Sequence, residues 1–590
     1  MKKRSEIQEK YKWDLSPLCK SDEEFYEVLE NAKKYLPKLK RFEGKLNNKK
    51  TIAEYLKLDK EFTHLVEPII LYISMKKNEE LSNSKYQLMS EKLSFFLNEL
   101  NIETAFASTE LHELSNEILD DIIADKEFSD YDRMFKSIKK DKKHQLSKAE
   151  EKLLAGMNFL GGFSKNMNQL ADVDFDFGDI EDKNGNKIPF SQSLYGKYMR
   201  CNDRVLRKNA FARMNGKYAE CINMLSSNYI SEVKANCYFS KVRKYKDVLS
   251  SALEGEEVKP SVYNNLIKMV RDNLPLLFDY YKIKQKELGL KDFYIYDCMA
   301  DTSKGDLSTY SYDEAIEIIK EAVKPLGEEY VRLVQTAKEE RWIDVYPNKD
   351  KRSGAYETGI YGYHPYVLTN FEGDIDSIFT LAHELGHAMH TYFSNKNQVE
   401  EKADYTIFLA EIASTTNEIL LLNHLLKKAN SKDEKKALYN KLFDEVKGSV
   451  YRQTMFAEFE QNMHAMVEKG EGLTKDILCD NYYKLNQEYF GKVKLVDEVK
   501  YEWARIPHFF TAFYVYKYAT GMISAINFAN RILNNEKGAV EDYFKFLSAG
   551  SSATPLQILK KSRCDLEKQE TFDKAFDYLK GVLADWKKLK

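Results

Sequence analysis

Two histidines four residues apart are the clearest chemical signal in the chain. The segment His383-Glu384-Leu385-Gly386-His387 has the form H-E-x-x-H, within a stretch whose apolar residues recur at helical spacing. Positions four apart lie on one face of a helix, so the two imidazoles can bind one zinc ion. Glu384 lies beside them and can act as general base towards a water held there. The spacing therefore predicts a zinc centre for hydrolysis, with one ion per chain.

A second helix, expected from about Tyr405, carries an acid inside an apolar run. This acid is Glu411, flanked by small residues that would let another helix approach closely. A catalytic zinc takes three protein ligands and keeps one position open, so Glu411 is predicted as the third ligand. Glu418, seven residues later, shares its helix face and is predicted to hold a ligand histidine. His390 shares the face of His387, and we interpret it as a pocket residue or a support for the ligands, because a fourth ligand would close the open position.

These motifs resemble those of a known family. The octapeptide H-E-L-G-H-A-M-H, followed some two dozen residues later by F-L-A-E-I-A-S-T, is similar to the thimet oligopeptidase family of zinc peptidases, in its oligoendopeptidase F branch. The resemblance extends over nearly the whole chain and includes Lys12-Trp13-Asp14-Leu15, Ser353-Gly354-Ala355-Tyr356 and the segment from Pro507 to Gly521. It implies a metalloendopeptidase that cuts internal bonds of short unstructured peptides in a channel between two helical lobes.

The segment from Pro507 to Gly521 combines His508 with several tyrosines. Tyr514 and Tyr518 are four apart and share a helix face, with His508 at or just before the helix start. Hydroxyl and imidazole donors can stabilise the oxyanion of peptide hydrolysis, whereas a plain aromatic packing stripe would show the same pattern. The resemblance favours a catalytic role. This chain has Phe509-Phe510 where thimet-type members are rich in glycine, and Tyr514 and Tyr518 are preferred to Tyr516.

Short extended runs precede the predicted zinc helix. They are Trp342–Val345, Gly354–Thr358 and Tyr366–Asn370. The free edge of such a strand can pair with an extended peptide backbone and gives affinity without side-chain specificity. We therefore expect Gly354 and Ala355 to contact the substrate backbone.

The remaining sequence is dominated by helical patterns, which predicts a mainly α, two-lobed metallopeptidase of the zincin type. A strict alternation over Val173–Phe177, followed by Asn184-Gly185, predicts a β-hairpin. We place a boundary after it, between an N-terminal helical lobe over residues 1–190 and a catalytic domain over residues 191–590. A small β-sheet is expected next to the zinc helix, beside a central substrate channel.

Composition restricts the partners and the location. The 590 residues carry a net charge of only −3, which argues against a nucleic-acid surface. Neither a signal peptide nor an apolar run of membrane-spanning length is expected. The seven cysteines are scattered without a C-x-x-C pair, which suits a reducing compartment. The prediction is a cytoplasmic protein that binds short peptides, with a monomer favoured.

Three alternatives remain open at this point. A dipeptidyl carboxypeptidase of the same family is the nearest one. A di-iron carboxylate bundle uses paired Glu-x-x-His motifs, and the chain offers both Glu384-x-x-His387 and Glu61-x-x-His64. A non-catalytic peptide-binding module is disfavoured because the expected base, Glu384, is present.

Overall fold

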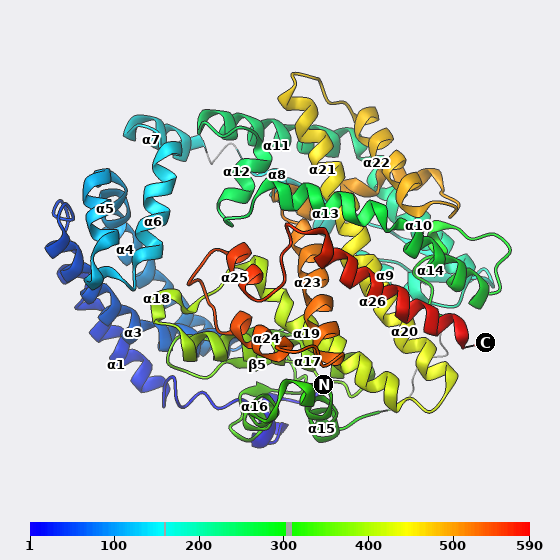
Figure 1. Cartoon of the computed structure of the whole chain (residues 1–590), viewed down its shortest axis with the longest axis horizontal. Helices are drawn as coiled ribbons and strands as arrows, with labels where there is room; N and C mark the ends of the chain where they lie inside the picture. Colours follow the sequence, from blue (N-terminus) through cyan, green and yellow to red (C-terminus); the bar gives the residue numbers. More distant parts are fainter. Residues whose placement is uncertain (158–160, 303–308, 590) are drawn as a thin grey trace. The chain divides into compact units, whose positions relative to one another are not determined.

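The computed structural model describes residues 1–157, 161–302 and 309–589, and most of these residues are helical (Figure 1). The chain forms two compact units, each assembled from three separate stretches. Unit 1 comprises Met1–Lys143, Leu307–His424 and Arg531–Ser562, and unit 2 comprises His144–Asp306, Leu425–Asn530 and Arg563–Lys590. This division does not test the boundary near residue 190, which stays a prediction.

Unit 1 contains the predicted zinc helix and a three-stranded sheet. Its helices are α1 (Asp22–Lys33), α2 (Leu36–Lys40), α3 (Lys49–Glu79), α4 (Ser84–Glu113), α5 (Asn116–Ala124), α6 (Asp132–Asp141), α15 (Tyr312–Val323), α16 (Glu328–Glu339), α17 (Ile375–Asn397), α18 (Glu400–Ala403), most of α19 (Ile407–Lys428), α24 (Ala539–Leu547) and α25 (Pro555–Lys561). Its strands are β3 (Ile343–Asp344), β4 (Tyr356–Thr358) and β5 (Tyr366–Leu368).

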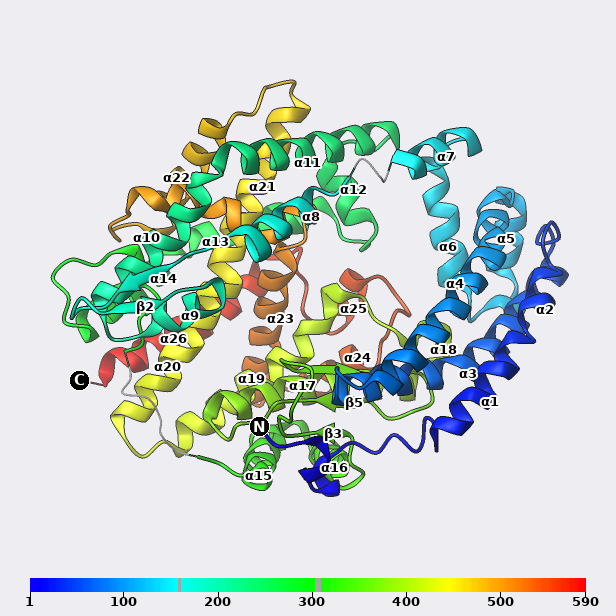
Figure 2. The same cartoon turned by 180° about the vertical axis from the view of Figure 1, so that it is seen from behind.

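The sheet of unit 1 has the order β3-β5-β4, with β5 parallel to β3 and antiparallel to β4. The fully buried β5 and the outer strand β4 both contact α17, so the expected small sheet beside the zinc helix is confirmed. The N-terminal segment runs next to β3 (Figure 2). There the amide of Val345 donates to the Tyr11 carbonyl at 3.0 Å, and the amide of Asp14 donates to the Arg341 carbonyl at 2.8 Å.

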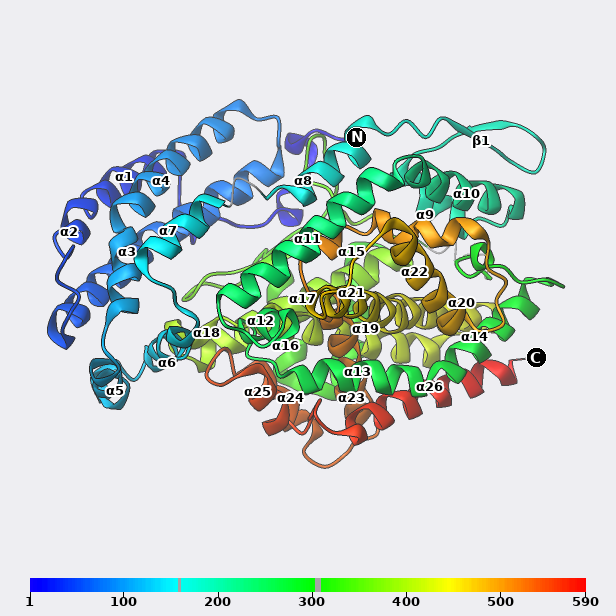
Figure 3. The same cartoon turned by 90° about the horizontal axis from the view of Figure 1, so that it is seen from above.

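Unit 2 is almost entirely helical. Its α-helices are α7 (Lys148–Met157), α8 (Phe163–Asn168), α9 (Gln192–Arg200), α10 (Arg204–Glu220), α11 (Ile222–Val242), α12 (Val248–Glu254), α13 (Pro260–Asp272), α14 (Leu274–Glu287), α20 (Lys432–Val446), α21 (Gln453–Glu468), α22 (Lys475–Phe490), most of α23 (Tyr516–Leu533) and α26 (Gln569–Lys588). Between them lie the π-helices η6 (Gln169–Asp174) and η9 (Lys447–Arg452), and the 3₁₀ segments η10 (Asp497–Arg505) and η11 (Pro507–Phe510). Within this unit α13 and α26 lie side by side (Figures 1 and 3).

The hairpin predicted in this region is present but shifted along the chain. Its strands β1 (Asp179–Glu181) and β2 (Lys187–Pro189) pair antiparallel, and Gly185 takes a positive φ of 78° in the turn between them. The strand predicted over Val173–Phe177 is wrong, because η6 ends at Asp174 and the next residues are irregular. The alternation there reflects ring packing instead, since Phe175 packs against Tyr218.

No helix in the described part of the chain is both long enough and apolar enough to cross a membrane. All seven cysteines are free thiols. The fold is mainly α with small sheets, as the sequence predicted.

Candidate metal centre

Helix α17 begins at a strong cap. The side chain of Asp374 accepts from the amide of Ser377 at 2.8 Å, which satisfies one of the backbone donors left open at a helix start. The helix buries an apolar face made of Ile378, Leu381, Leu385 and Met389. Burial of that face fixes the rotation of the helix and therefore the direction of His383 and His387.

Helices α17 and α19 touch backbone to backbone at Gly386. A Cβ atom at this position would lie 2.5 Å from Cα of Ser414 and 2.8 Å from the carbonyl oxygen of Ala413. Only glycine fits there, and the small residues of α19 complete the contact. The close approach expected from the flanks of Glu411 is therefore present, and it sets the spacing between the two helices.

Hydrogen bonds between buried groups also join α17 and α19, one helical turn from Gly386. The side-chain amide of Asn417 donates to the carbonyl of Ala382 at 3.1 Å, and the Tyr330 hydroxyl donates to Asn417 at 2.9 Å. Both Tyr330 and Asn417 are fully buried. Because a buried polar group is costly without its partner, these bonds fix the register of α19 against α17.

The three predicted ligands meet at this junction. The Nε2 atoms of His383 and His387 are 3.2 Å apart. An Oε2 atom of Glu411 lies 3.3 Å from Nε2 of His383 and 3.6 Å from Nε2 of His387. One donor atom from each residue falls within 4.8 Å of the other two. Two imidazoles and one carboxylate are the donor set of a catalytic zinc site, so the residues fit this metal.

Glu418 bonds to the far side of His383. Its carboxylate pairs with Nδ1 of His383, which directs Nε2 towards His387 and Glu411. Such a carboxylate behind a histidine orients the ring and makes it more basic. The structure thus places Glu418 against His383, and its role in supporting a metal ligand stays a prediction.

The electrostatics favour a cation between these residues. Burial disfavours a charged His383, yet its bonds to Glu411 and Glu418 prevail and raise its pKa to about 10. Burial also disfavours the Glu411 carboxylate, but the two histidines prevail and lower its pKa to about 2. The pKa of His387 falls to about 4, first through burial and then through His383. A metal ion would replace the proton that this cluster draws to His383.

Glu384 lies on the same helix as the histidines and is only 7% exposed. Burial raises the pKa of its carboxyl to about 7. A carboxyl in that range can both accept and release a proton near neutral pH.

His390 is buried too deeply in the protein to contact a substrate. Its ring is fully buried, stacked on Tyr405 with centroids 3.7 Å apart and packed against Phe546 of α24. Burial lowers its pKa to about 3, so the ring stays neutral. A residue that contacts a substrate must be exposed, and His390 is not. The prediction that remains for His390 is a supporting role beneath His383 and His387 of α17.

Gly354 and Ala355 lead into the outer strand β4. Gly354 has a positive φ of 80° and is exposed, and its carbonyl accepts from the Asn370 side chain at 2.8 Å. The same strand contains Glu357, a residue that was not predicted from the sequence. Burial raises the pKa of Glu357 to about 8, although Thr391 of α17 bonds to it. The signal in the sequence that could have identified Glu357 was an acid inside a run that otherwise favours an extended strand.

His508, Tyr514 and Tyr518 form a cluster of rings within unit 2. The Tyr518 hydroxyl lies 3.3 Å from Nε2 of His508, and the Tyr514 ring is 5.6 Å from that of Tyr518 and 6.1 Å from that of His508. Tyr516 is fully buried against Tyr263 instead. The structure therefore places His508 beside Tyr514 and Tyr518, the two tyrosines preferred from the sequence, whereas Tyr516 belongs to the core.

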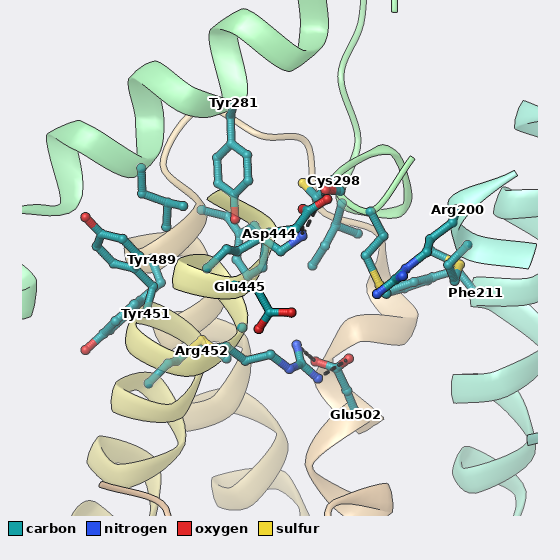
Figure 4. A pocket seen from close by; sticks show the side chains of 18 of the residues that line it. Arg200, Phe211, Tyr281, Cys298, Asp444, Glu445, Tyr451, Arg452, Tyr489 and Glu502 are labelled. Atoms are coloured by element: carbon teal, nitrogen blue, oxygen red, sulfur yellow. Dashed lines mark hydrogen bonds and ion pairs between the residues drawn. The ribbon is translucent and has the colours of Figure 1, made fainter. Parts of the chain in front are cut away.

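A cavity of about 400 Å³ also lies within unit 2, partly walled by η9. Two ion-pair groups lie at its walls (Figure 4). Asp444 accepts from Lys284 and Lys447, and Glu502 accepts from Arg452 and Arg505. None of the residues predicted as catalytic or metal-binding lines this cavity.

The paired motif needed for a di-iron bundle is not assembled. Glu61 and His64 of α3 are both exposed, and His64 bonds to Glu400 at 2.6 Å. Neither residue is part of the His383, His387 and Glu411 group. That alternative is therefore not supported.

The chain is similar to known peptidases in both sequence and fold. The profile described as Peptidase family M3 matches residues 197–578, and that described as Oligopeptidase F matches residues 110–177. Oligopeptidase PepF of Bacillus subtilis is 35% identical over 99% of this chain and 88% of the relative. Group B oligopeptidase PepB of Streptococcus agalactiae is 34% identical over 99% of this chain and 98% of its own. The crystal structure of oligoendopeptidase-F from Enterococcus faecium superposes with a TM-score of 0.72 at 29% identity, covering 96% of this chain and 98% of that one.

Proposed function

Because the chain belongs to peptidase family M3, in its oligoendopeptidase F branch, we propose that it is a zinc-dependent endopeptidase of short unstructured peptides. Family membership makes it a metallopeptidase, and the non-catalytic binding module is thereby set aside. The observation that carries the zinc proposal is the convergence of His383, His387 and Glu411 at the junction of α17 and α19.

These three residues would hold one zinc ion, and Glu418 would orient His383. When bound, zinc acts as a Lewis acid that lowers the pKa of water to about 7 and polarises a scissile carbonyl. The rest of the chemistry belongs to the chain.

Glu384 is the proposed general base and then the general acid. Its carboxylate removes a proton from the attacking water, and the resulting carboxylic acid returns that proton to the nitrogen of the leaving amine. The buried position of Glu384 supports this exchange, because burial brings its pKa to about 7. Glu384 is not one of the three grouped metal ligands, so its role can be separated from theirs.

His508, Tyr514 and Tyr518 are proposed to donate hydrogen bonds to the oxyanion. Their mutual contacts within unit 2 support a shared role, since the Tyr518 hydroxyl and Nε2 of His508 lie 3.3 Å apart. The backbone at Gly354 and Ala355 is proposed to pair with the substrate main chain at the edge of β4. Pairing through the main chain would allow many side-chain sequences to be cut.

The proposal is tested with a mixture of unstructured peptides of graded length, with cleavage positions determined by mass spectrometry. We expect internal cleavage of short peptides, loss of activity on chelation and recovery with zinc. Glu384→Gln should keep its zinc by elemental analysis and lose turnover, because only the base is removed. Intact casein should resist. Release of dipeptides solely from carboxyl ends would instead establish the dipeptidyl carboxypeptidase alternative, and a fully active Glu384→Gln variant would refute the assigned base.

The cytoplasmic location and the monomeric state remain predictions from the sequence. Gel filtration at several protein concentrations would test the second of these directly.

A further inference from the structure

A buried acid of α21 contacts the segment that carries the ring cluster. Glu460 has no exposed surface, and its Oε1 atom accepts from the backbone amide of Phe513 at 2.8 Å. Phe513 lies between His508 and Tyr514 in sequence and is itself only 3% exposed. A buried amide needs an acceptor, and Glu460 provides it.

Phe513 has a backbone conformation that such a residue rarely adopts. Its φ is +55°, in the left-handed region that favours glycine. It is the third residue of a turn that is closed by the amide of Tyr514 donating to the carbonyl of Thr511 at 3.2 Å. A bulky residue at this position persists only where its surroundings hold it.

Two sets of contacts hold it. The Phe513 ring packs edge-on against Tyr263, with centroids 5.5 Å apart, and against His464 at 5.0 Å. The amide is held by Glu460, on the same helix as His464. Side chain and main chain of Phe513 are thus fixed from one direction by α21 and from another by α13.

The turn determines how the ring cluster is arranged. It joins η11, which carries His508, to the start of α23, which carries Tyr518, and Tyr514 is its last residue. A change in φ at Phe513 would rotate the chain on one side of the turn relative to the other. The spacing between His508 and the two tyrosines therefore depends on the conformation of this residue.

An apolar residue would occupy the position of Glu460 at less cost if no acceptor were needed, because burying a carboxyl is unfavourable. Burial raises the pKa of Glu460 well above its usual value, and the nearby acid Glu232 adds to the rise. Burial thus favours the protonated carboxyl, whose carbonyl oxygen can accept the bond from Phe513.

We propose that Glu460 is a positioning residue that locks the left-handed Phe513 and thereby arranges His508, Tyr514 and Tyr518 for catalysis. The catalytic consequence rests on the proposed function of these three residues. The positioning of the segment by Glu460 does not depend on that proposal, and it can be measured without an activity assay.

The test compares Glu460→Gln with Glu460→Met. Glutamine keeps a carbonyl oxygen at the same reach, whereas methionine fills similar space without an acceptor. Glu458→Met is the matched control on the same helix, because Glu458 bonds instead to Arg271 and Tyr489. Each variant is examined by hydrogen exchange of the peptide covering residues 508–518, by kcat and KM, and by zinc content.

We expect Glu460→Gln to match the parent in all measurements. Glu460→Met should exchange faster over residues 508–518 and lose about tenfold to a hundredfold in kcat, with a smaller change in KM and unchanged zinc. The Glu458→Met control should leave the exchange of this segment and kcat unchanged. Should Glu460→Met fail to fold, Glu460→Asp withdraws the acceptor by about 1.5 Å while keeping a carboxyl, and faster exchange is again expected.

Unchanged exchange in Glu460→Met or Glu460→Asp would overturn the proposal, as would a Glu460→Gln variant as impaired as the methionine variant. Faster exchange with unchanged kcat would uphold the positioning and refute the catalytic role proposed for the ring cluster. The failure of either proposal is thereby distinguishable from the failure of the other.

Discussion

Replacing Gly386 by alanine tests whether the contact between α17 and α19 sets the metal centre. The new Cβ would lie 2.5 Å from Cα of Ser414, whereas carbon atoms in contact prefer about 3.5 Å. The obstructing atoms belong to backbone, so the helices themselves must separate by about 1 Å. His383 and His387 lie on one helix and Glu411 on the other, while metal–ligand distances tolerate only about 0.2 Å.

We therefore expect Gly386→Ala to weaken zinc binding by at least about tenfold to a hundredfold, the range seen when support of a metal ligand is lost. Overpacking should also lower the free energy of unfolding by about 1–3 kcal/mol, partly offset by about 1 kcal/mol from the better helix propensity of alanine. Zinc affinity is measured by competition with a chelator, activity with a quenched fluorescent peptide, and stability by urea denaturation.

Gly216→Ala provides the matched control. Gly216 lies inside α10, and a Cβ there would meet nothing within 4 Å. This variant should gain up to about 1 kcal/mol in stability with unchanged activity. If Gly386→Ala behaved like Gly216→Ala, with parental zinc affinity and turnover, the reasoning from the helix contact would be refuted.

Three further predictions concern individual side chains. Glu411→Ala should lose zinc and activity together, because it removes one of three ligands; a fully metallated, active variant by elemental analysis would place the third ligand elsewhere. Glu418→Gln should lower zinc affinity about tenfold to a hundredfold in chelator competition, since His383 loses the carboxylate that orients it, and parental affinity would contradict this support. At least one of Tyr514→Phe and Tyr518→Phe should lose about a hundredfold to a thousandfold in kcat, with KM, zinc content and melting temperature little changed. Parental kcat in both variants would mean that neither tyrosine donates to the oxyanion, and the same kinetic test would then be applied to His508.

The grouping of residues at the candidate metal centre was largely predictable because its elements are local. The four-residue spacing of His383 and His387 fixes a shared helix face, and an acid flanked by small and apolar residues near the start of α19 points to Glu411. Glu418 followed from helical periodicity alone. Local rules of this kind hold because the helices themselves are stabilised by their buried faces.

Other features depend on contacts between distant parts of the chain and could not be predicted. The small residues beside Glu411 indicate a close helix approach but not that Gly386 makes it. The sequence likewise gives no sign that Asn417 reaches Ala382, or that Glu460 accepts from Phe513 more than fifty residues later. The strand predicted over Val173–Phe177 failed for a related reason. Alternating apolar residues can pack as isolated rings in irregular chain as well as in a ladder, and periodicity does not distinguish the two.

The assembly of unit 1 from three distant stretches has a consequence for the order of events on the ribosome. The candidate ligands His383, His387 and Glu411 are synthesised well before α24, which packs against α17 through Phe546 and His390. At about 5–20 residues per second, the interval between Glu418 and the end of unit 1 at Ser562 lasts roughly 7 to 30 s. During that time the nascent helices of residues 1–143 and the ligand helices lack part of their core. The core beneath the candidate metal centre is thus completed late in translation, and a nascent chain released before α24 emerges would expose the apolar surface around His390 to chaperones and proteases.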